Sequence, residues 1–192
     1  MHETEMEKMM NNCLYNSPIG ILRIGEDSGR ITSLYLHQKE NDSTYDNSIS
    51  QMQQNKQNRQ HQQEQRSELL TEACRQLDEY FQGKRRNFDL PIGYAGTPFQ
   101  KKVWRELQSI PYGETRSYED IAVKIGSPRA VRAVGQANNR NPILLIIPCH
   151  RVIHKNGDIS GFACGIAAKK YLLDLEKNFK NNTRQERGKM LK

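Results

Sequence analysis

Residues 117–138 read SYEDIAVKIGSPRAVRAVGQAN, and their pattern predicts two short helices. Ser117 precedes an acidic residue by three positions, which is the signature of a helix N-cap, and a glycine closes this first helix. The pair Ser127-Pro128 then predicts the start of a second helix, which runs to about Asn138. Two helices separated by so short a turn form a helix-turn-helix.

The second of these helices has an unusual composition. Arg129 and Arg132 fall on one face, Gln136 follows four residues later, and most other positions are alanine or glycine. Small side chains let a helix approach another surface closely, and arginines can contact phosphates or enter a base stack. The pattern is typical of a DNA-contacting helix, and it also fits a helix packed tightly against its own core.

The rest of the chain predicts an α+β protein. Residues 97–100 read TPFQ, a capping box that starts a helix ending near Ile110, and residues 69–81 carry apolar side chains at helical spacing before Gly83. Alternating runs predict a small antiparallel sheet near residues 13–15, 19–24 and 31–36. We therefore expect a small sheet-plus-helix domain, followed by a mostly helical domain with the helix-turn-helix.

These signals divide the chain into three parts. Residues 1–92 form the N-terminal domain, residues 93–180 form the second domain, and residues 181–192 form a basic flexible tail. A segment at about 43–66 is rich in Gln, Asn and His and has almost no apolar side chains. Such a segment cannot bury enough surface to order itself, which predicts a disordered insertion. Because Gln tolerates helices, it could instead extend the helix at 69–81.

Composition excludes some classes of protein. Only 35% of the 192 residues are hydrophobic and the mean hydropathy is −0.86, and no run approaches the ~18 apolar residues of a membrane span. The first ten residues lack the apolar core of a signal peptide, so we expect an intracellular protein, cytoplasmic in a prokaryote or nuclear in a eukaryote. The four cysteines form no C-x-x-C pair, which favours reduced thiols.

The charge is unevenly distributed. Residues 1–92 have a net charge of −3, whereas residues 93–192 have a net charge of +10. An excess of this size suggests a polyanionic partner, with nucleic acid the first candidate, although a solvated basic surface gives the same count.

The strongest chemical signal lies at residues 143–153, ILLIIPCHRVI. The apolar run predicts a buried strand that leads directly into Cys149, and a short strand and an Asn-Gly hairpin turn follow. A cysteine becomes nucleophilic when a base or a positive charge lies near it, and His150 and Arg151 offer both. The last predicted helix runs from about Ile166 to Phe179. Glu176 on this helix could orient the histidine or could simply face solvent. An inert buried thiol is the alternative interpretation.

Residues 148–152, PCHRV, are part of a wider set of motifs. These include Gly96–Gln100, Val103-Trp104, Ile110–Thr115, Ser117-Tyr118, Arg132–Gly135, Ala137-Asn138, Asn141-Pro142, Gly161-Phe162, Gly165, Lys169, Leu172-Leu173 and Glu176. The set spans about 80 residues and resembles the C-terminal domain of the O6-alkylguanine-DNA alkyltransferases. The stretch Ser17–Gly20 and the sheet near it suit that family's ribonuclease H-like first domain.

The resemblance implies a role for each matching residue. Cys149 would accept the alkyl group from the O6 atom of guanine in a single irreversible turnover, with the O4 atom of an alkylated thymine as a second candidate donor. His150 would activate the thiol through a water and would itself be oriented by Glu176. Asn141 would fix the chain near the cysteine, and Tyr118 would protonate the departing guanine.

The resemblance also implies how DNA is held. Arg132 would fill the gap left by a flipped nucleotide, and the second helix would lie in the minor groove. The other implied DNA-contacting residues are Arg129, Ser117, Ala133 and Gly135. The implied base pocket consists of Pro148, Val152, Phe162, Ala163 and Lys169, with the N–H groups of Cys149 and Ala163 facing the O6 atom.

Cofactors and partners follow from the same resemblance. Some members bind zinc through the N-terminal domain, but Cys13, Cys74 and His37 do not fall at those positions, so we expect no metal and no cofactor. The expected partner is double-stranded DNA containing O6-alkylguanine. We expect the protein to bind it as a monomer and to have no membrane partner.

Three other functions are compatible with parts of the pattern. An alkyltransferase-like lesion sensor would have Trp in place of Cys149. A Cys-His hydrolase or acyltransferase would use the same nucleophile with turnover and without DNA. A transcription regulator would use the helix-turn-helix, but no additional effector or dimerisation module is evident.

Overall fold

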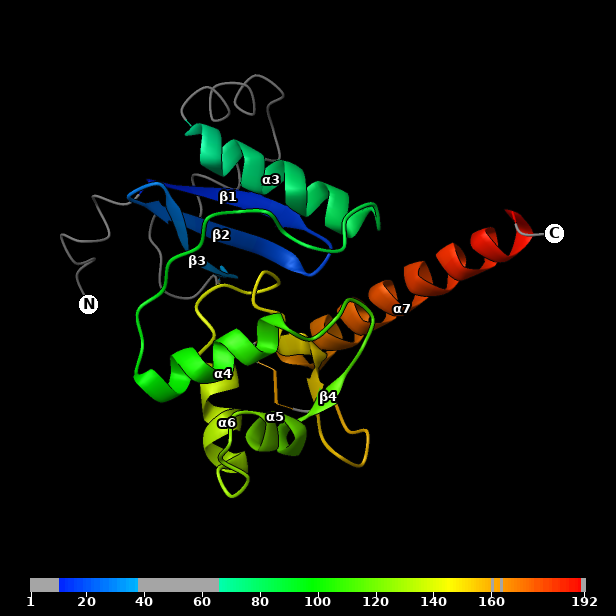
Figure 1. Ribbon diagram of the computed structural model, residues 1–192. Coiled ribbons are helices and arrows are strands. Elements are labelled where there is room, and N and C mark those ends of the chain that lie inside the picture. Colours follow the sequence, from blue (N-terminus) through cyan, green and yellow to red (C-terminus); the bar gives the residue numbers. More distant parts are fainter. Residues whose placement is uncertain (1–10, 38–65, 160, 163, 191–192) are drawn as a thin grey trace.

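The computed structural model describes residues 11–37, 66–159, 161–162 and 164–190 (Figure 1). The predicted Gln-rich insertion lies outside these ranges, apart from Arg66. A three-stranded sheet covered by one helix forms the N-terminal half, and the helix-turn-helix belongs to a mostly helical C-terminal half, so the expected α+β class is confirmed.

The N-terminal sheet consists of β1 (Asn11–Ser17), β2 (Gly20–Asp27) and β3 (Arg30–Leu36), antiparallel and in that order. β1 and β2 bury alternate side chains, Cys13 and Tyr15 on β1 and Leu22 and Ile24 on β2. β3 buries Ile31 and Leu34, three positions apart, because its register with β2 shifts between Gly25 and Glu26. Helix α3 (Glu68–Phe81) begins at its N-cap Ser67 and covers the sheet (Figure 1). This arrangement confirms the predicted sheet-plus-helix unit.

The two halves join along β3. Ile31 exchanges backbone hydrogen bonds of 2.8 and 3.0 Å with residues 91–93 of the linker. Leu34 exchanges two more, each 2.9 Å long, with residues 142–144. The same strand therefore anchors the linker and the segment that leads to Cys149.

The predicted capping box at Thr97 and the predicted N-cap at Ser117 both form, and the cap at Ser117 is also a full capping box. Thr97 caps α4 (Pro98–Gln108), and Ser117 caps α5 (Tyr118–Lys124). The indole N–H of Trp104 on α4 donates to the carbonyl of Ala137 at 2.8 Å, which fixes α4 against the second helix of the helix-turn-helix.

That second helix, α6 (Val131–Asn139), begins three residues later than predicted. Ser127 accepts a 2.8 Å hydrogen bond from the N–H of Ala130, so Ser127–Ala130 form a turn. Ser at the first position and Pro at the second are also favoured in β-turns, which explains the error. Arg129 consequently lies in the turn and does not share a helix face with Arg132.

Residues 143–147 are largely buried, but the predicted strand is wrong. Within the described residues, only Ile143 pairs with a strand residue, Leu34, and the residues after it turn, with Leu145 at φ +67°. The side chain of Asn141 accepts from the N–H of Ile143 and donates to the carbonyl of Ile147, replacing a strand neighbour. A short apolar run cannot by itself distinguish a buried strand from a buried turn.

The segment after the turn carries the thiol. Cys149–Arg151 form a 3₁₀ turn, η2, and β5 (Val152–Ile153) pairs in parallel with β4 (Arg116–Ser117). The predicted turn at 155–158 forms, but β5 continues into no hairpin within the described part of the chain.

The last helix, α7 (Gly165–Met190), extends beyond the predicted end at Phe179 and into the predicted tail. Its C-terminal part projects from the body of the protein (Figure 1). Among the described residues, no helix combines the length and apolar character needed to cross a membrane.

Candidate active site

Cys149 lies at the start of η2 and is 2% exposed. The Asn141 amide donates to its sulfur at 3.0 Å and to the carbonyl of Ile147 at 2.7 Å. The backbone N–H of Cys149 donates to the same carbonyl at 2.8 Å, so it is already engaged and does not point freely at a substrate atom as the resemblance implied. Asn141 therefore holds both the turn and the thiol, which agrees with its expected position.

The structure fixes the tautomer of His150. Its Nε2 atom lies 2.8 Å from Glu176 Oε1, and both side chains are fully buried. An ionised carboxylate can only accept, so Nε2 carries the proton and Nδ1 has the free lone pair. Nδ1 is buried and has no hydrogen-bond partner among the described residues. Burial also lowers the pKa of His150, which keeps the ring neutral and able to accept a proton.

Glu176, on α7, is the centre of this network. Its other donors are the Tyr80 hydroxyl and the Gly113 N–H, both at 2.8 Å, and Arg151, whose Nε lies 3.0 Å from Oε2. Burial opposes ionisation, but the hydrogen bond from His150 and the charge of Arg151 lower the pKa of Glu176 to about 2. The carboxylate is therefore ionised, and the predicted alternative of a solvent-facing glutamate is wrong.

Arg151 contacts Glu176 rather than the thiol that it was expected to activate. Its Nη1 atom also donates to the carbonyl of Ile110 at 2.6 Å. Burial raises the pKa of Cys149 to about 12, while the Asn141 hydrogen bond and the charge of Lys169 act in the opposite direction. A thiol in this environment needs a base to remove its proton, and His150 is its sequence neighbour.

Tyr118, the first residue of α5, lies within electrostatic range of the thiol. Burial raises its pKa, and the proximity of Cys149 raises it further, so the phenol remains protonated and can donate. Among the described residues, the hydroxyl makes one contact, of 3.5 Å, with the carbonyl of Gly161. Tyr118 lines a surface groove of about 640 Å³ together with Arg132, Gly135 and Gly161.

Lys169, which the resemblance placed in the base pocket, is fully buried on α7. Burial lowers the pKa of its amine, while the charges of Cys149 and Asp158 raise it. The amine therefore lies within electrostatic range of the thiol, and a positive charge there favours the thiolate.

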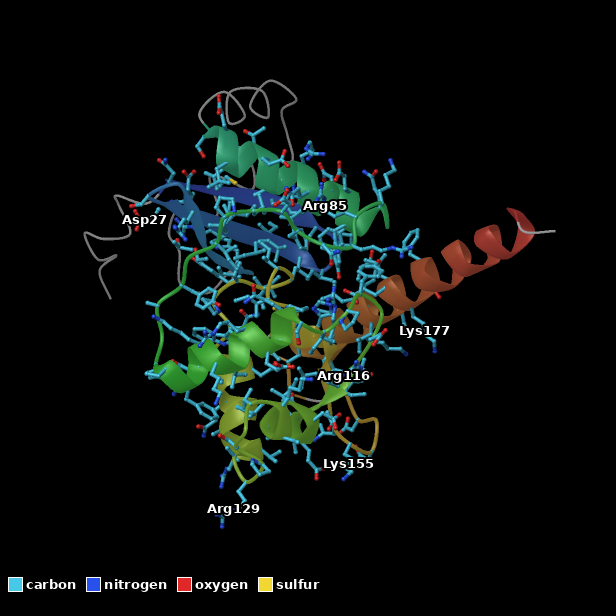
Figure 2. The ribbon with its side chains drawn as sticks, viewed as in Figure 1. Asp27, Arg85, Arg116, Arg129, Lys155 and Lys177 are labelled. Atoms are coloured by element: carbon cyan, nitrogen blue, oxygen red, sulfur yellow. The ribbon has the colours of Figure 1, made fainter. Side chains whose placement is uncertain are left out.

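The expected DNA-contacting residues separate into two groups. Arg132 is exposed on α6 and lines the groove with Gly135, and Ala133 is half-buried on the same helix. Arg129 lies in the preceding turn, at the same end of the molecule as Lys155 (Figure 2). Ser117 is buried, and its hydroxyl accepts from the N–H of Asp120, so it caps α5.

The expected base pocket is only partly visible. Pro148 and Val152 are buried next to Cys149 in the chain, and Phe162 is half-buried. Ala163 lies outside the described residues.

Comparison with known proteins gives independent evidence on the family of this chain. The model of the 6-O-methylguanine DNA methyltransferase ribonuclease-like domain matches residues 10–94, and that of the DNA binding domain matches residues 98–178. The chain belongs to the 6-O-methylguanine DNA methyltransferase family. The resemblance drawn from the sequence motifs is thereby confirmed.

Relatives in this methyltransferase family match over most of their length. The constitutive methylated-DNA–protein-cysteine methyltransferase of Bacillus subtilis is 46% identical over 165 residues, which cover 84% of this chain and 92% of that protein. The Methanosarcina acetivorans protein named methylated-DNA–protein-cysteine methyltransferase is 43% identical over 168 residues, 87% of this chain and 98% of the other.

Solved structures of the methyltransferase family share the fold. The O6-methylguanine methyltransferase of Mycobacterium tuberculosis has a TM-score of 0.70 at 39% identity, covering 88% of this chain and 94% of that one. The crystal structure of M. tuberculosis OGT in complex with DNA has a TM-score of 0.69 at 36% identity, covering 86% and 92%.

Sequence reasoning missed two donors in the methyltransferase site. Tyr80 comes from the N-terminal helix α3, 96 positions from Glu176, and the Gly113 N–H comes from the turn after α4. Neither residue carries a local motif for this role. The only available signal was Tyr80 in the apolar stripe of α3, which the sequence assigned to the core.

Proposed function

We propose that the protein repairs DNA as a methylated-DNA–protein-cysteine methyltransferase, transferring an alkyl group from O6-alkylguanine to Cys149. The observation that carries this proposal is the fixed tautomer of His150. Glu176 accepts a hydrogen bond of 2.8 Å from the Nε2–H group, which leaves Nδ1 as a buried base on the residue that follows the thiol in the chain. An imidazole held in this way is the arrangement by which a carboxylate prepares a histidine to activate a nucleophile.

The reaction then proceeds in one displacement. The proton of Cys149 moves to Nδ1 of His150, through one water, and the sulfur attacks the alkyl carbon. A carbon–sulfur bond forms as the carbon–oxygen bond to guanine breaks. Tyr118, whose raised pKa keeps it protonated, gives a proton to the departing base. The product is a thioether, so each chain reacts once.

DNA is the partner of the domain at 98–178, and we propose that α6 enters its minor groove. The exposed Arg132 and the small Gly135 line the groove next to Tyr118, which supports a path from the helix to the thiol. The target atom lies inside a stacked duplex, so the nucleotide must be flipped out, and Arg132 would fill the space it leaves. A monomer is sufficient for this arrangement.

The test is intact-protein mass spectrometry after incubation with a duplex that contains O6-methylguanine. We expect one added methyl group, on the peptide containing Cys149, and none with Cys149→Ala. Repeated turnover beyond one methyl per chain would overturn the proposal and would favour the Cys-His hydrolase or acyltransferase alternative.

A further inference from the structure

A second pair of thiols lies in the N-terminal half. Cys13 on β1 and Cys74 on α3 are each 8% exposed, and their sulfur atoms are 3.8 Å apart. The proposed alkyl transfer uses neither of them. Two thiols brought this close from positions 61 residues apart invite a chemical explanation.

The packing of α3 on β1 keeps the two sulfur atoms opposite each other. Two residues along β1, the Tyr15 hydroxyl donates to Asp78 at 2.7 Å, and Asp78 follows Cys74 by one helical turn. Strand residues two apart share one face of the sheet, and helix residues four apart share one face of the helix. The Tyr15–Asp78 contact therefore fixes the position of α3 along β1 and keeps the sulfurs facing each other.

A guanidinium makes the pair asymmetric. Arg66 Nη1 lies 3.4 Å from the sulfur of Cys74, and its Nη2 donates to the carbonyl of Leu14 at 3.0 Å. The Nε atom of Arg66 is buried without a hydrogen-bond partner in the described part of the chain. A hydrogen bond from Cys13 and the charge of Arg66 lower the pKa of Cys74, whereas the interaction with Cys74 and burial raise that of Cys13. Cys74 is thus the nucleophile, and Cys13 keeps its proton.

We propose that Cys13 and Cys74 form a reversible redox pair that a hydroperoxide oxidises to a disulfide and a dithiol reductant restores. The sulfurs must approach from 3.8 Å to the ~2.05 Å of a disulfide, which rotation of the two side chains about χ1 can supply. Such a bond would tie β1 to α3 at a point where the two elements are already in contact.

The proposed chemistry balances in two steps. The Cys74 thiolate attacks one peroxide oxygen, a sulfur–oxygen bond forms, the oxygen–oxygen bond breaks, and the released hydroxide leaves as water after taking a proton from solvent. Cys13 then attacks the sulfur of the Cys74 sulfenic acid. The sulfur–sulfur bond forms, the sulfur–oxygen bond breaks, and the leaving hydroxide takes the Cys13 proton as a second water. The two thiols lose two electrons, and the peroxide gains them.

The test uses the full-length chain with Cys149→Ser and Cys164→Ser, so that only the proposed pair remains. After treatment with one equivalent of hydrogen peroxide, we expect a loss of about 2 Da and a linked Cys13–Cys74 peptide, both reversed by dithiothreitol. Recovery of Cys13 and Cys74 as free thiols, or their overoxidation without a link, would overturn the proposal.

Two further variants test the assigned roles. In the same background, Cys13→Ser should stop at a sulfenic acid on Cys74 that dimedone traps, whereas Cys74→Ser should give no trapped adduct at Cys13. Arg66→Gln should slow disulfide formation by roughly tenfold without changing the product, because it removes the charge that favours the thiolate. An adduct on Cys13 in place of Cys74 would overturn the assignment.

The redox proposal and the proposed repair function can be tested separately. With Cys149 restored, Cys13→Ser should transfer methyl groups from an alkylated duplex as the wild-type chain does. Loss of the disulfide with intact transfer would overturn only the redox proposal, and loss of transfer in the wild-type chain would overturn only the repair function.

Discussion

The two nitrogen atoms of His150 lie in opposite environments. On the Nε2 side, Glu176 is buried and accepts hydrogen bonds from four residues on three different segments of the chain. The Nδ1 atom has no hydrogen-bond partner among the described residues. Within the same part of the chain, Cys149 has one side-chain donor, Asn141, and the Tyr118 hydroxyl makes a single long contact. Glu176, which positions His150, therefore has its hydrogen-bond acceptors occupied before any substrate arrives, and we call this part of the site the saturated side. Cys149, Tyr118 and the Nδ1 atom, which would exchange protons, still have free hydrogen-bonding capacity within the described residues; together with the DNA-facing groove they form the open side, as expected for a preorganised site.

Breaking the saturated side should have the largest effect. Glu176→Gln replaces the anion that holds Nε2, so the imidazole loses both its orientation and its partner charge. We expect single-turnover transfer from an alkylated duplex to slow by roughly 10²- to 10⁴-fold, the usual range of a general acid–base contribution. Affinity for unmodified DNA should not change, because Glu176 is fully buried.

The saturated network also dictates the control for this experiment. Glu176→Gln leaves the guanidinium of Arg151 buried without its counter-charge, a loss of about 3–5 kcal/mol in stability for a broken buried pair. The double variant Glu176→Gln/Arg151→Met removes both charges and should recover much of the thermal stability without recovering transfer. Recovery of the wild-type rate in the double variant would show that the carboxylate only supports the fold.

The same carboxylate should make stability depend on pH. The pKa of Glu176 is about 2 in the fold, compared with 4.5 for the free side chain. A depressed carboxyl pKa stabilises the fold above pH 4.5, and this contribution, about 3 kcal/mol, is lost as the pH falls through about 2. Urea unfolding at decreasing pH should show a steeper loss for the wild type than for the double variant. Parallel curves would contradict the charge network.

The open side can be tested through DNA. Arg132→Ala should slow repair of a duplex by roughly 10- to 100-fold. Unstacking the target base costs ~a few kcal/mol, and the Arg132 side chain that fills its place offsets part of this cost. Reaction with free O6-benzylguanine should be unchanged, since no stack has to be opened. Arg140→Ala, which removes an exposed arginine at the end of the same helix but outside the groove, is the matched control. Equal losses in both variants would point to net charge alone.

Sequence predicted the elements whose signals are local and unambiguous. The boxes at Thr97 and Ser117 each satisfy two backbone donors with side chains three residues apart, so nothing distant is required. The Ser127-Pro128 pair and the apolar run at 143–147 are compatible with more than one backbone, and both were assigned wrongly. Neighbours in space decided those two segments, above all the side chain of Asn141.

The site shows the same division between local and distant information. Cys149 and His150 were found because they are adjacent in a motif; Glu176 was one candidate on the last predicted helix, and the family resemblance favoured the orienting role over solvent exposure. Tyr80 and Gly113 could not be found, because their roles exist only once the two halves of the chain pack together. The hydroxyl of Tyr80 is thus the contribution of the N-terminal half to the histidine relay.

Tyr80→Phe should produce the smallest and most informative change on the saturated side. Tyr80 donates to Oε1 of Glu176, the oxygen that also binds His150. Without this donor, Oε1 keeps more of its negative charge and stabilises the protonated imidazole, so the pKa of His150 should rise. A hydrogen bond to a charged group contributes ~1.5–3 kcal/mol, and only part of it acts on His150, so we expect a shift of roughly half a pH unit.

The measurement is the rate of transfer across pH under single-turnover conditions. The acid limb of the profile should move to higher pH in Tyr80→Phe, because the base is protonated, and therefore unable to accept, over a wider range. Tyr112→Phe is the matched control, since its ring packs edge-on against Tyr80 and its buried hydroxyl has no hydrogen-bond partner in the described residues. It should leave the limb in place. A positioning role predicts a shifted limb in Tyr80→Phe alone, whereas a lower melting temperature with an unmoved limb would assign Tyr80 to packing only.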